Sequence, residues 1–210
     1  MSRCLRLAAA VVCAIALLCA AGSGAPATEH ASRLAPFFAR VRGAGRAQVQ
    51  IERRTRSALA EGEQVTRGRV TLEPPARARV DFEGGECVTV RDDGGEWLQP
   101  AFRQLVKLGP ERARGALGWC DLLLGDRAGA IRSHDLADGR VLLVRAEGPN
   151  AADSAWASLD ASGQPTVLEF RAASGELERT RLTHWSFSAA RGRAAFVLTA
   201  PHGFEIVDLP

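Results

Sequence analysis

Tyrosine is absent from this sequence of 210 residues, and the other aromatic side chains are few, with eight phenylalanines and four tryptophans. Surfaces that bind single-stranded nucleic acid stack the bases on aromatic rings, so this scarcity argues against such a surface. Lysine is nearly absent too, since Lys107 is the only one. The arginines are spread along the sequence rather than clustered, and the formal net charge is only +3, which indicates a solvated outer face. We therefore predict no nucleic-acid partner.

The sequence motifs of common catalytic sites are missing as well. No GxSxG, HExxH or GxxxxGK[ST] pattern occurs in the sequence. His134 stands beside Asp135, but adjacent residues on a strand point to opposite sides, and no nucleophile can be placed near them. We therefore predict that the protein is not an enzyme, and that it has no catalytic residues, no metal site and no cofactor.

Cysteine is scarce, with five residues, of which three lie close to the N-terminus at Cys4, Cys13 and Cys19. Cys87 and Cys120 remain, and no CxxC spacing supports a zinc or redox role. If the compartment is oxidising, this pair is compatible with a disulfide that closes a loop of about 34 residues and stabilises the fold by roughly 3–4 kcal/mol. Two buried thiols fit the sequence equally well.

The one long apolar run, from Leu7 to Ala21, follows Arg3 and Arg6 and precedes small residues up to Ala27. These are the parts of a secretory signal peptide, and the run is shorter than the ~20 residues of a membrane-spanning helix. The residue before Cys19 is leucine rather than a small residue, which disfavours lipidation of that cysteine. We predict a signal peptide over residues 1–27 and one domain over residues 28–210.

The stretch from Gly68 to Leu105 predicts an antiparallel meander with one apolar face. Apolar residues alternate with polar ones in each of its segments, at Val70 and Leu72, Val80 and Phe82, and Val88 and Val90. A period of two is typical of strands with one buried face. Turns are favoured between these segments at Pro74-Pro75, Gly84-Gly85 and Asp93-Gly94-Gly95.

The same alternation predicts strands before and after the meander. About ten or eleven strands at a spacing near ten residues favour one large antiparallel sheet, curled or closed into a barrel. The further strands are expected at Arg46–Arg54, Gln64–Leu72, Arg140–Arg145, Ala155–Leu159, Thr166–Arg171, Glu178–Ser188 and Arg193–Thr199.

Two segments predict helices that cover the sheet. His30–Arg42 places its apolar residues at helical spacing, with Ser32 as a candidate N-cap, Pro36 in the first turn, and Gly43 and Gly45 ending the helix. Between Pro110 and Gly129 the alternation stops, and glycines divide an apolar, helix-like segment. The fold class is therefore mainly β, with an N-terminal helix and a short mid-chain helical segment.

Several motifs, in their order and spacing, resemble the LolA family of periplasmic lipoprotein carriers, and more broadly the LolA-like lipid-carrier superfamily. The resemblance spans about Ser32 to Leu209. The matching residues are Gly68-Arg69-Val70-Thr71-Leu72 followed by Pro74-Pro75 and Arg79, Asp93-Gly94 followed by Trp97, Pro100 with Gln104, Leu159-Asp160 with Gly163, Pro165 and Phe170, and the closing residues Phe196, Pro201, Gly203 and Glu205.

The resemblance implies an open, half-closed β-barrel whose helices form a lid over one mouth. It also implies a monomeric carrier in the periplasm that binds the acyl chains of lipoproteins, or another lipid, in an apolar cavity. Such carriers take their cargo from an inner-membrane ABC transporter and deliver it to an outer-membrane receptor. Two alternatives remain open: an outer-membrane-anchored receptor of the same fold, and an envelope domain that binds a protein partner and carries nothing.

Under this hypothesis the inward apolar residues line the lipid cavity, and residues of the two helical segments form the lid. The cavity residues are Val49, Ile51, Val70, Leu72, Val80, Phe82, Val88, Val90 and Trp97. The lid residues are Phe37, Phe38, Leu122 and Leu123. Ordinary core packing is the alternative role for the same side chains.

The sequence departs from the family at one position. The best-known carriers have an arginine directly before the proline that follows this strand, and that arginine is associated with holding the lid shut. Glu73 stands there in this sequence. Arg77 and Arg79 are the candidates to replace that gating arginine.

Overall fold

The computed structural model describes residues 32–56, 63–116, 118–124, 131–145, 154–171 and 177–210. These residues belong to one compact unit, Ser32–Pro210. The predicted signal peptide and the first two residues of the predicted helix, His30 and Ala31, lie outside the described residues. In the part of the chain that is described, no helix is long and apolar enough to cross a membrane.

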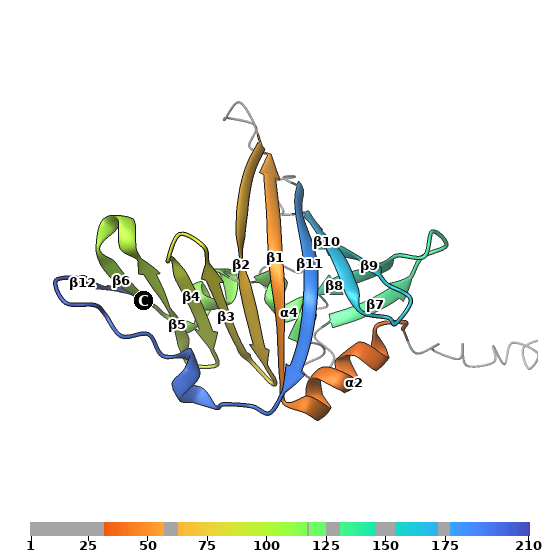
Figure 1. Cartoon of the computed structure of the whole chain (residues 1–210), viewed down its shortest axis with the longest axis horizontal. Helices are drawn as coiled ribbons and strands as arrows, with labels where there is room; N and C mark the ends of the chain where they lie inside the picture. The colour runs from red at the N-terminus through yellow and green to blue at the C-terminus, as the bar shows by residue number, and fades with distance from the viewer. Residues whose placement is uncertain (1–31, 57–62, 117, 125–130, 146–153, 172–176) are drawn as a thin grey trace, which may run out of the picture. The chain divides into compact units, whose positions relative to one another are not determined.

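One curved sheet of twelve strands dominates the unit (Figure 1). Its strand order is β12-β6-β5-β4-β3-β2-β1-β11-β10-β9-β8-β7, so β12 and β7 form the two open edges and the sheet does not close. The strands are β1 (Arg46–Arg56), β2 (Glu63–Glu73), β3 (Arg77–Phe82), β4 (Cys87–Arg91), β5 (Gly94–Gln99), β6 (Gln104–Leu108), β7 (Ile131–Asp135), β8 (Val141–Arg145), β9 (Ser154–Leu159), β10 (Pro165–Arg171), β11 (Leu177–Ser188) and β12 (Glu205–Leu209). The predicted open half-barrel, mainly β, is confirmed.

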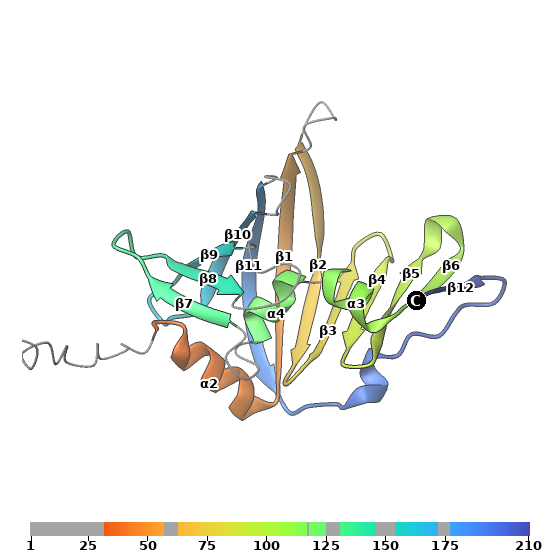
Figure 2. The same cartoon turned by 180° about the vertical axis from the view of Figure 1, so that it is seen from behind.

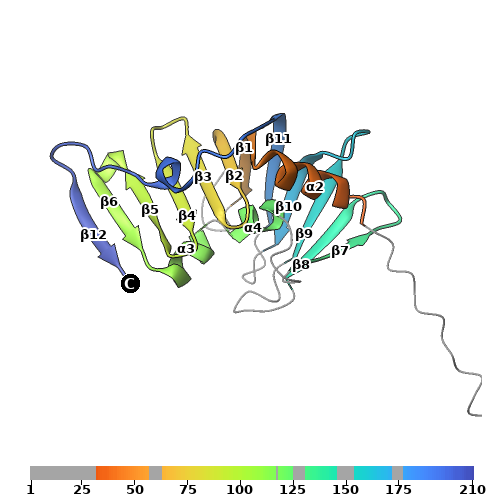
Figure 3. The same cartoon turned by 90° about the horizontal axis from the view of Figure 1, so that it is seen from below.

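Three α-helices lie on the same face of this sheet. They are α2 (Ala35–Ala44), α3 (Pro110–Ala116) and α4 (Gly118–Leu124). Helix α3 packs on β4, β5 and β6, α4 packs on β2, and α2 packs on β1 and β11 and also meets α4. Figure 2 shows α3 and α4 in front of the strands, and Figure 3 shows the sheet curving around them. We call this face the inner face and the opposite one the outer face.

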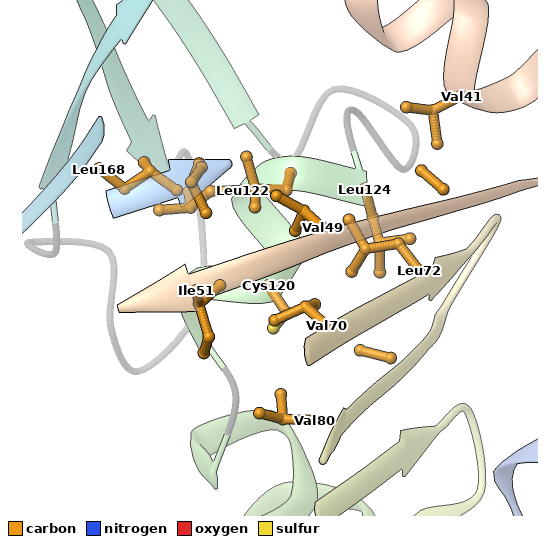
Figure 4. Packing of buried hydrophobic residues seen from close by; sticks show 14 of the residues in the cluster. Val41, Val49, Ile51, Val70, Leu72, Val80, Cys120, Leu122, Leu124 and Leu168 are labelled. Carbon is orange, nitrogen blue, oxygen red and sulfur yellow. The ribbon is translucent and has the colours of Figure 1, made fainter. Parts of the chain in front are cut away.

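The register of the strands explains why the core lies on the inner face. Val49 pairs with Val70, Val70 with Val80, and Val80 with Val88, so apolar side chains from four neighbouring strands point the same way. Because side chains alternate along a strand, the polar residues between them face outward. The inner-face residues join residues of the helices in one buried cluster (Figure 4).

Helix α2 begins later than the sequence suggested. Its N-cap position is Leu34, which makes no side-chain cap, so the assignment of Ser32 as N-cap is wrong. Ser32 instead accepts hydrogen bonds from the N–H groups of Leu34 (3.3 Å) and Ala35 (2.7 Å) just before the helix. Pro36 does lie in the first turn. The helix runs through Gly43 and ends at Gly45, whose φ of +86° suits glycine and whose N–H bonds the Val41 carbonyl.

The C-terminal region differs most from the prediction. The expected strand Arg193–Thr199 is wrong, because Arg193–Phe196 forms a short 3-10 helix, η2, and the residues after it are not in a strand. The chain crosses the outer face here and then forms β12, which is parallel to β6, whereas the other neighbouring strands are antiparallel. Strand β7 was not predicted. A second 3-10 helix, η1 (Pro100–Phe102), links β5 and β6.

Candidate functional site

The candidate site is the inner face together with the helices that cover it. Seven of the nine predicted cavity residues are buried, with exposed fractions of 0–6%. These seven are Val49, Ile51, Val70, Leu72, Val80, Val88 and Val90. The other two, Phe82 and Trp97, are partly buried and pack against the same cluster. Trp97 also donates an indole hydrogen bond to a carboxylate oxygen of Glu86.

The predicted lid residues lie in the same cluster. Phe37 and Phe38 come from α2, Leu122 and Leu123 come from α4, and their exposed fractions range from 1% to 9%. Figure 4 shows Leu122, Leu124 and Cys120 of α4 among the side chains of β1 and β2. The structure therefore brings cavity and lid residues into direct packing, and the helices fill the space over these strands with their own side chains.

Aromatic side chains of β11 extend this site and were missed by the sequence reasoning. Phe37 packs edge-on against Trp185, with ring centroids 4.9 Å apart, and Trp185 stacks on Phe187. The Trp185 indole N–H donates to the Pro165 carbonyl at 2.7 Å, so the polar atom of this ring has a partner while its apolar part covers the core.

A β-bulge in β11 explains how these rings reach the inner face. Gln48 pairs with Ser186 and Gln50 with Thr183, so two residues of β11 stand opposite Val49 alone. One of the two, His184, has a φ of +56°, the left-handed conformation that a bulge of this kind uses. The added residue lets Leu182, Trp185 and Phe187 all point inward. A strict period of two does not reveal such an insertion.

The inner face also continues over the second half of the sheet, where the sequence reasoning placed no site residue. Strands β8 to β11 contribute buried residues to the same cluster. These residues are Val141, Leu143, Ala155, Ala157, Leu168 and Leu182. The spacing of two between Val141 and Leu143 was the sequence feature that could have predicted inner-face residues in this half of the sheet. The apolar surface is thus about as wide as the sheet.

The two candidate gating arginines lie on the outer face, away from the helices. Arg77 forms an ion pair with Glu73 at 3.4 Å, and its guanidinium carbon lies 6.0 Å from the centre of the Phe196 ring. Arg79 binds the carboxylate of Asp81 at 2.7–3.0 Å and donates to the Ala195 carbonyl. Both therefore contact the chain that crosses the outer face.

Glu73 holds the same crossing chain. Its side chain is fully buried. One carboxylate oxygen accepts the N–H of Arg191 at 2.6 Å, and the other accepts the N–H of Gly192 at 3.1 Å. We call residues 189–204 the C-terminal segment. In this structure Glu73, which stands where the LolA family has an arginine, anchors the C-terminal segment on the face opposite α2, α3 and α4.

The two cysteines are not joined by a disulfide, so the alternative of two buried thiols holds. Cys120 lies in the inner cluster, whereas Cys87 faces outward and donates its S–H to Asp81 at 3.2 Å. The sheet separates the two sulfurs. Burial, together with the nearby Asp81 carboxylate, raises the pKa of Cys87 to about 12, which keeps this thiol protonated and unreactive.

Two pockets open on the outer face, and both are lined by charged side chains. One has a volume of about 500 Å³ and is lined by charged residues of both signs from β1, β2, β3 and β11, among them Glu52, Arg67 and Arg181. The second, of about 410 Å³, lies between β1, β2, β3 and the C-terminal segment. Among the described residues, no group of three or more His, Cys, Asp or Glu side chains is placed to hold a metal ion.

No family model and no curated protein matches the sequence. Several solved structures have a similar fold. An uncharacterized conserved protein from Thermus thermophilus matches with a TM-score of 0.47 and 16% identity, over 83% of this chain and 98% of its own. A LolA superfamily protein from Nitrosomonas europaea matches with a TM-score of 0.46 and 12% identity, over 80% of this chain and 99% of its own.

A putative outer membrane lipoprotein-sorting protein domain from Vibrio parahaemolyticus matches with a TM-score of 0.47 and 9% identity, over 78% of this chain and 94% of its own. These are likenesses of fold.

Proposed function

We propose that the protein carries a lipid hydrocarbon chain against the inner face of its sheet. One observation carries this proposal: a continuous apolar face, spread over an unclosed sheet, is covered by three short helices of 10, 7 and 7 residues. Isolated helices of this length are not stable in water. They are held by the apolar surface beneath them, and a competing apolar ligand can take their place.

The physical need for such a carrier is large. Exposure to water costs about 0.8 kcal/mol for each CH₂ group, so exposing an acyl chain with about 14 of these groups costs about 11 kcal/mol. A concave apolar sheet removes this cost without any catalytic group. Binding then requires that α4 or α2 moves off the sheet, because its side chains occupy the surface that the ligand needs.

The route of transport belongs to the same proposal. The predicted signal peptide and the family resemblance support a monomeric protein in the periplasm that accepts acylated lipoproteins, or another lipid, from an inner-membrane ABC transporter. It then delivers this cargo to an outer-membrane receptor. A receptor anchored through Cys19 is the related alternative, and that residue lies outside the described part of the chain.

Uptake of a fluorescent fatty acid by the purified protein tests the carrier function. We expect a saturable rise in fluorescence with about one site per chain, and competition by an unlabelled long-chain fatty acid but not by a short-chain one. A protein that binds neither a fatty acid nor an acylated lipoprotein is not a carrier of this kind.

Close packing of the inner face favours a second candidate, an envelope domain that binds a protein partner. The seven buried cavity residues are as covered as those of an ordinary core, which suits a module whose interior holds nothing. A folded protein without lipid uptake, isolated in a stable complex with another envelope protein, would favour this candidate over the carrier.

A further inference from the structure

The charged side chains that line the pocket of about 410 Å³ on the outer face are mainly positive. Four arginines line it, and Asp81 is the only acidic residue among its lining side chains. These arginines are Arg46, Arg69, Arg79 and Arg191. They come from β1, β2, β3 and the C-terminal segment, so the fold itself gathers them from four stretches of the chain.

Asp81 forms hydrogen bonds with only one of these arginines, Arg79, while the positive charge of Arg69 also lowers the pKa of Asp81. Its carboxylate takes three hydrogen bonds from Arg79, one of them 2.7 Å long. Within the described part of the chain, no ion pair includes Arg46, Arg69 or Arg191. The pocket therefore holds three positive charges without a carboxylate bound to them.

Of the three, Arg46 gives the strongest indication of a bound anion. Only 8% of the residue is exposed, and its Nε–H is buried without a hydrogen-bond partner. A guanidinium stays charged inside a protein, and a buried donor without a partner is costly. Burial, and the positive charges of Arg191 and Arg79, lower the pKa of Arg46, while Glu73 raises it.

Glu73 is the nearby acid, but its oxygens are already engaged. They accept the N–H groups of Arg191 and Gly192 and pair with Arg77. It also does not line the pocket. The electrostatic balance of this site thus leaves room for an anion that binds Arg46 directly.

A hydroxyl group completes the donor set. Thr71 lines the pocket and is buried, and its oxygen accepts a hydrogen bond from the side-chain amide of Gln48 at 3.0 Å. Its own O–H therefore remains able to donate to a ligand. Guanidinium forks and a hydroxyl are the groups that bind tetrahedral oxyanions well.

We propose that this pocket binds a phosphate group, with Arg46 as the central ligand and Arg69, Arg191 and Thr71 around it. A volume of about 410 Å³ admits a phosphate with a small substituent, so the group comes from a lipid headgroup or from a free phosphate. This site lies on the opposite face of the sheet from the proposed lipid site and does not depend on it.

Titration calorimetry with inorganic phosphate and with glycerol 3-phosphate, at constant ionic strength, tests the proposal. Both anions should bind at least tenfold more tightly than chloride. We expect Arg46→Gln to weaken phosphate binding at least tenfold and Arg69→Gln to weaken it several-fold. The matched control is Arg132→Gln, which removes an exposed positive charge from β7, away from the pocket, and should change affinity less than twofold.

Vesicles distinguish the source of the phosphate group. Cosedimentation with phosphatidylglycerol vesicles but not phosphatidylcholine vesicles, lost in Arg46→Gln and kept in Arg132→Gln, assigns the site to a lipid headgroup. Binding of the soluble phosphates alone assigns it to a free phosphate. The proposal is overturned if neither probe binds better than chloride, or if Arg46→Gln and Arg132→Gln behave alike. Because Arg69 is exposed, its variant remains informative even if Arg46→Gln does not fold.

Discussion

Glu73 occupies a position where the family resemblance leads one to expect an arginine, and its contacts differ from the expected ones. The family resemblance made this position a candidate for lid control, where an arginine would be expected. In the structure its carboxylate is fully buried and binds two backbone N–H groups of the C-terminal segment. The role of the residue is therefore to fix this segment on the outer face, and the acidic side chain supplies the acceptors that the backbone needs.

Glu73→Gln should lower the free energy of unfolding by about 2–4 kcal/mol, because the amide replaces one acceptor with a donor and leaves Arg77 without its counter-charge. Urea denaturation followed by circular dichroism measures this change. The control is Glu52→Gln, which breaks contacts with Arg54 and Arg67 near the surface and should cost less than about 1 kcal/mol. Equal losses in the two variants would contradict the anchoring role.

At the scale of elements, the sequence predicts well where one face of a strand is apolar. Val70, Val80 and Val88 alternate with polar residues, and β2, β3 and β4 form where that pattern lies. The Pro74-Pro75 turn falls between β2 and β3, as expected. These features are local, because a period of two and a turn residue act within a few positions of the chain.

The elements that the sequence did not predict depend on distant contacts. Phe196 is fully buried although its segment forms no strand. Side chains of the sheet satisfy the backbone there: Arg91 donates to the Phe196 carbonyl at 2.6 Å, and Glu96 accepts the N–H of Leu198 at 2.6 Å. The alternating pattern in this segment therefore reflects packing on a sheet rather than pairing within it. The sequence does not reveal the bulge at His184 either, because the extra residue is defined by the pairing of β11 with β1.

Helix α4 should compete with a bound lipid for the inner face. Leu123→Ala removes a side chain that is 1% exposed, and such a change lowers the stability of the lipid-free protein by about 2–5 kcal/mol. If the lipid displaces α4, the substitution also lowers the free energy needed to move α4 off the sheet. The affinity for a fluorescent fatty acid should then rise several-fold.

Fluorescence titration and urea denaturation of the same preparation check this expectation. Val65→Ala shortens an exposed side chain on β2 and serves as the control, with stability and affinity close to those of the parent protein. A destabilised Leu123→Ala protein with unchanged or weaker fatty-acid binding would show that α4 does not act as a lid.

At the scale of the whole unit, one sheet supports two different surfaces. The strands that present Val49 and Val70 to the helices also present Gln48, Arg69 and Thr71 to the outer pocket, because neighbouring residues on a strand point to opposite faces. The inner surface is apolar and covered by helices, while the outer one is rich in arginine and crossed by the C-terminal segment. An acyl chain and a phosphate group would therefore occupy separate sites.

Independence of the two faces gives the last prediction. Arg46→Gln should abolish most phosphate binding and leave fatty-acid affinity within twofold. Leu123→Ala should raise fatty-acid affinity several-fold and leave phosphate affinity within twofold. For each ligand, the change in binding free energy in the double variant should equal the sum of the changes in the two single variants within about 0.5 kcal/mol, as it does for sites that share no partners. A larger deviation in calorimetric titrations would mean that the sheet transmits a change from one face to the other. The C-terminal segment, fixed to β2 through Glu73, would then be the element to examine, since it is the outer part in contact with both the pocket and the strand beneath α4.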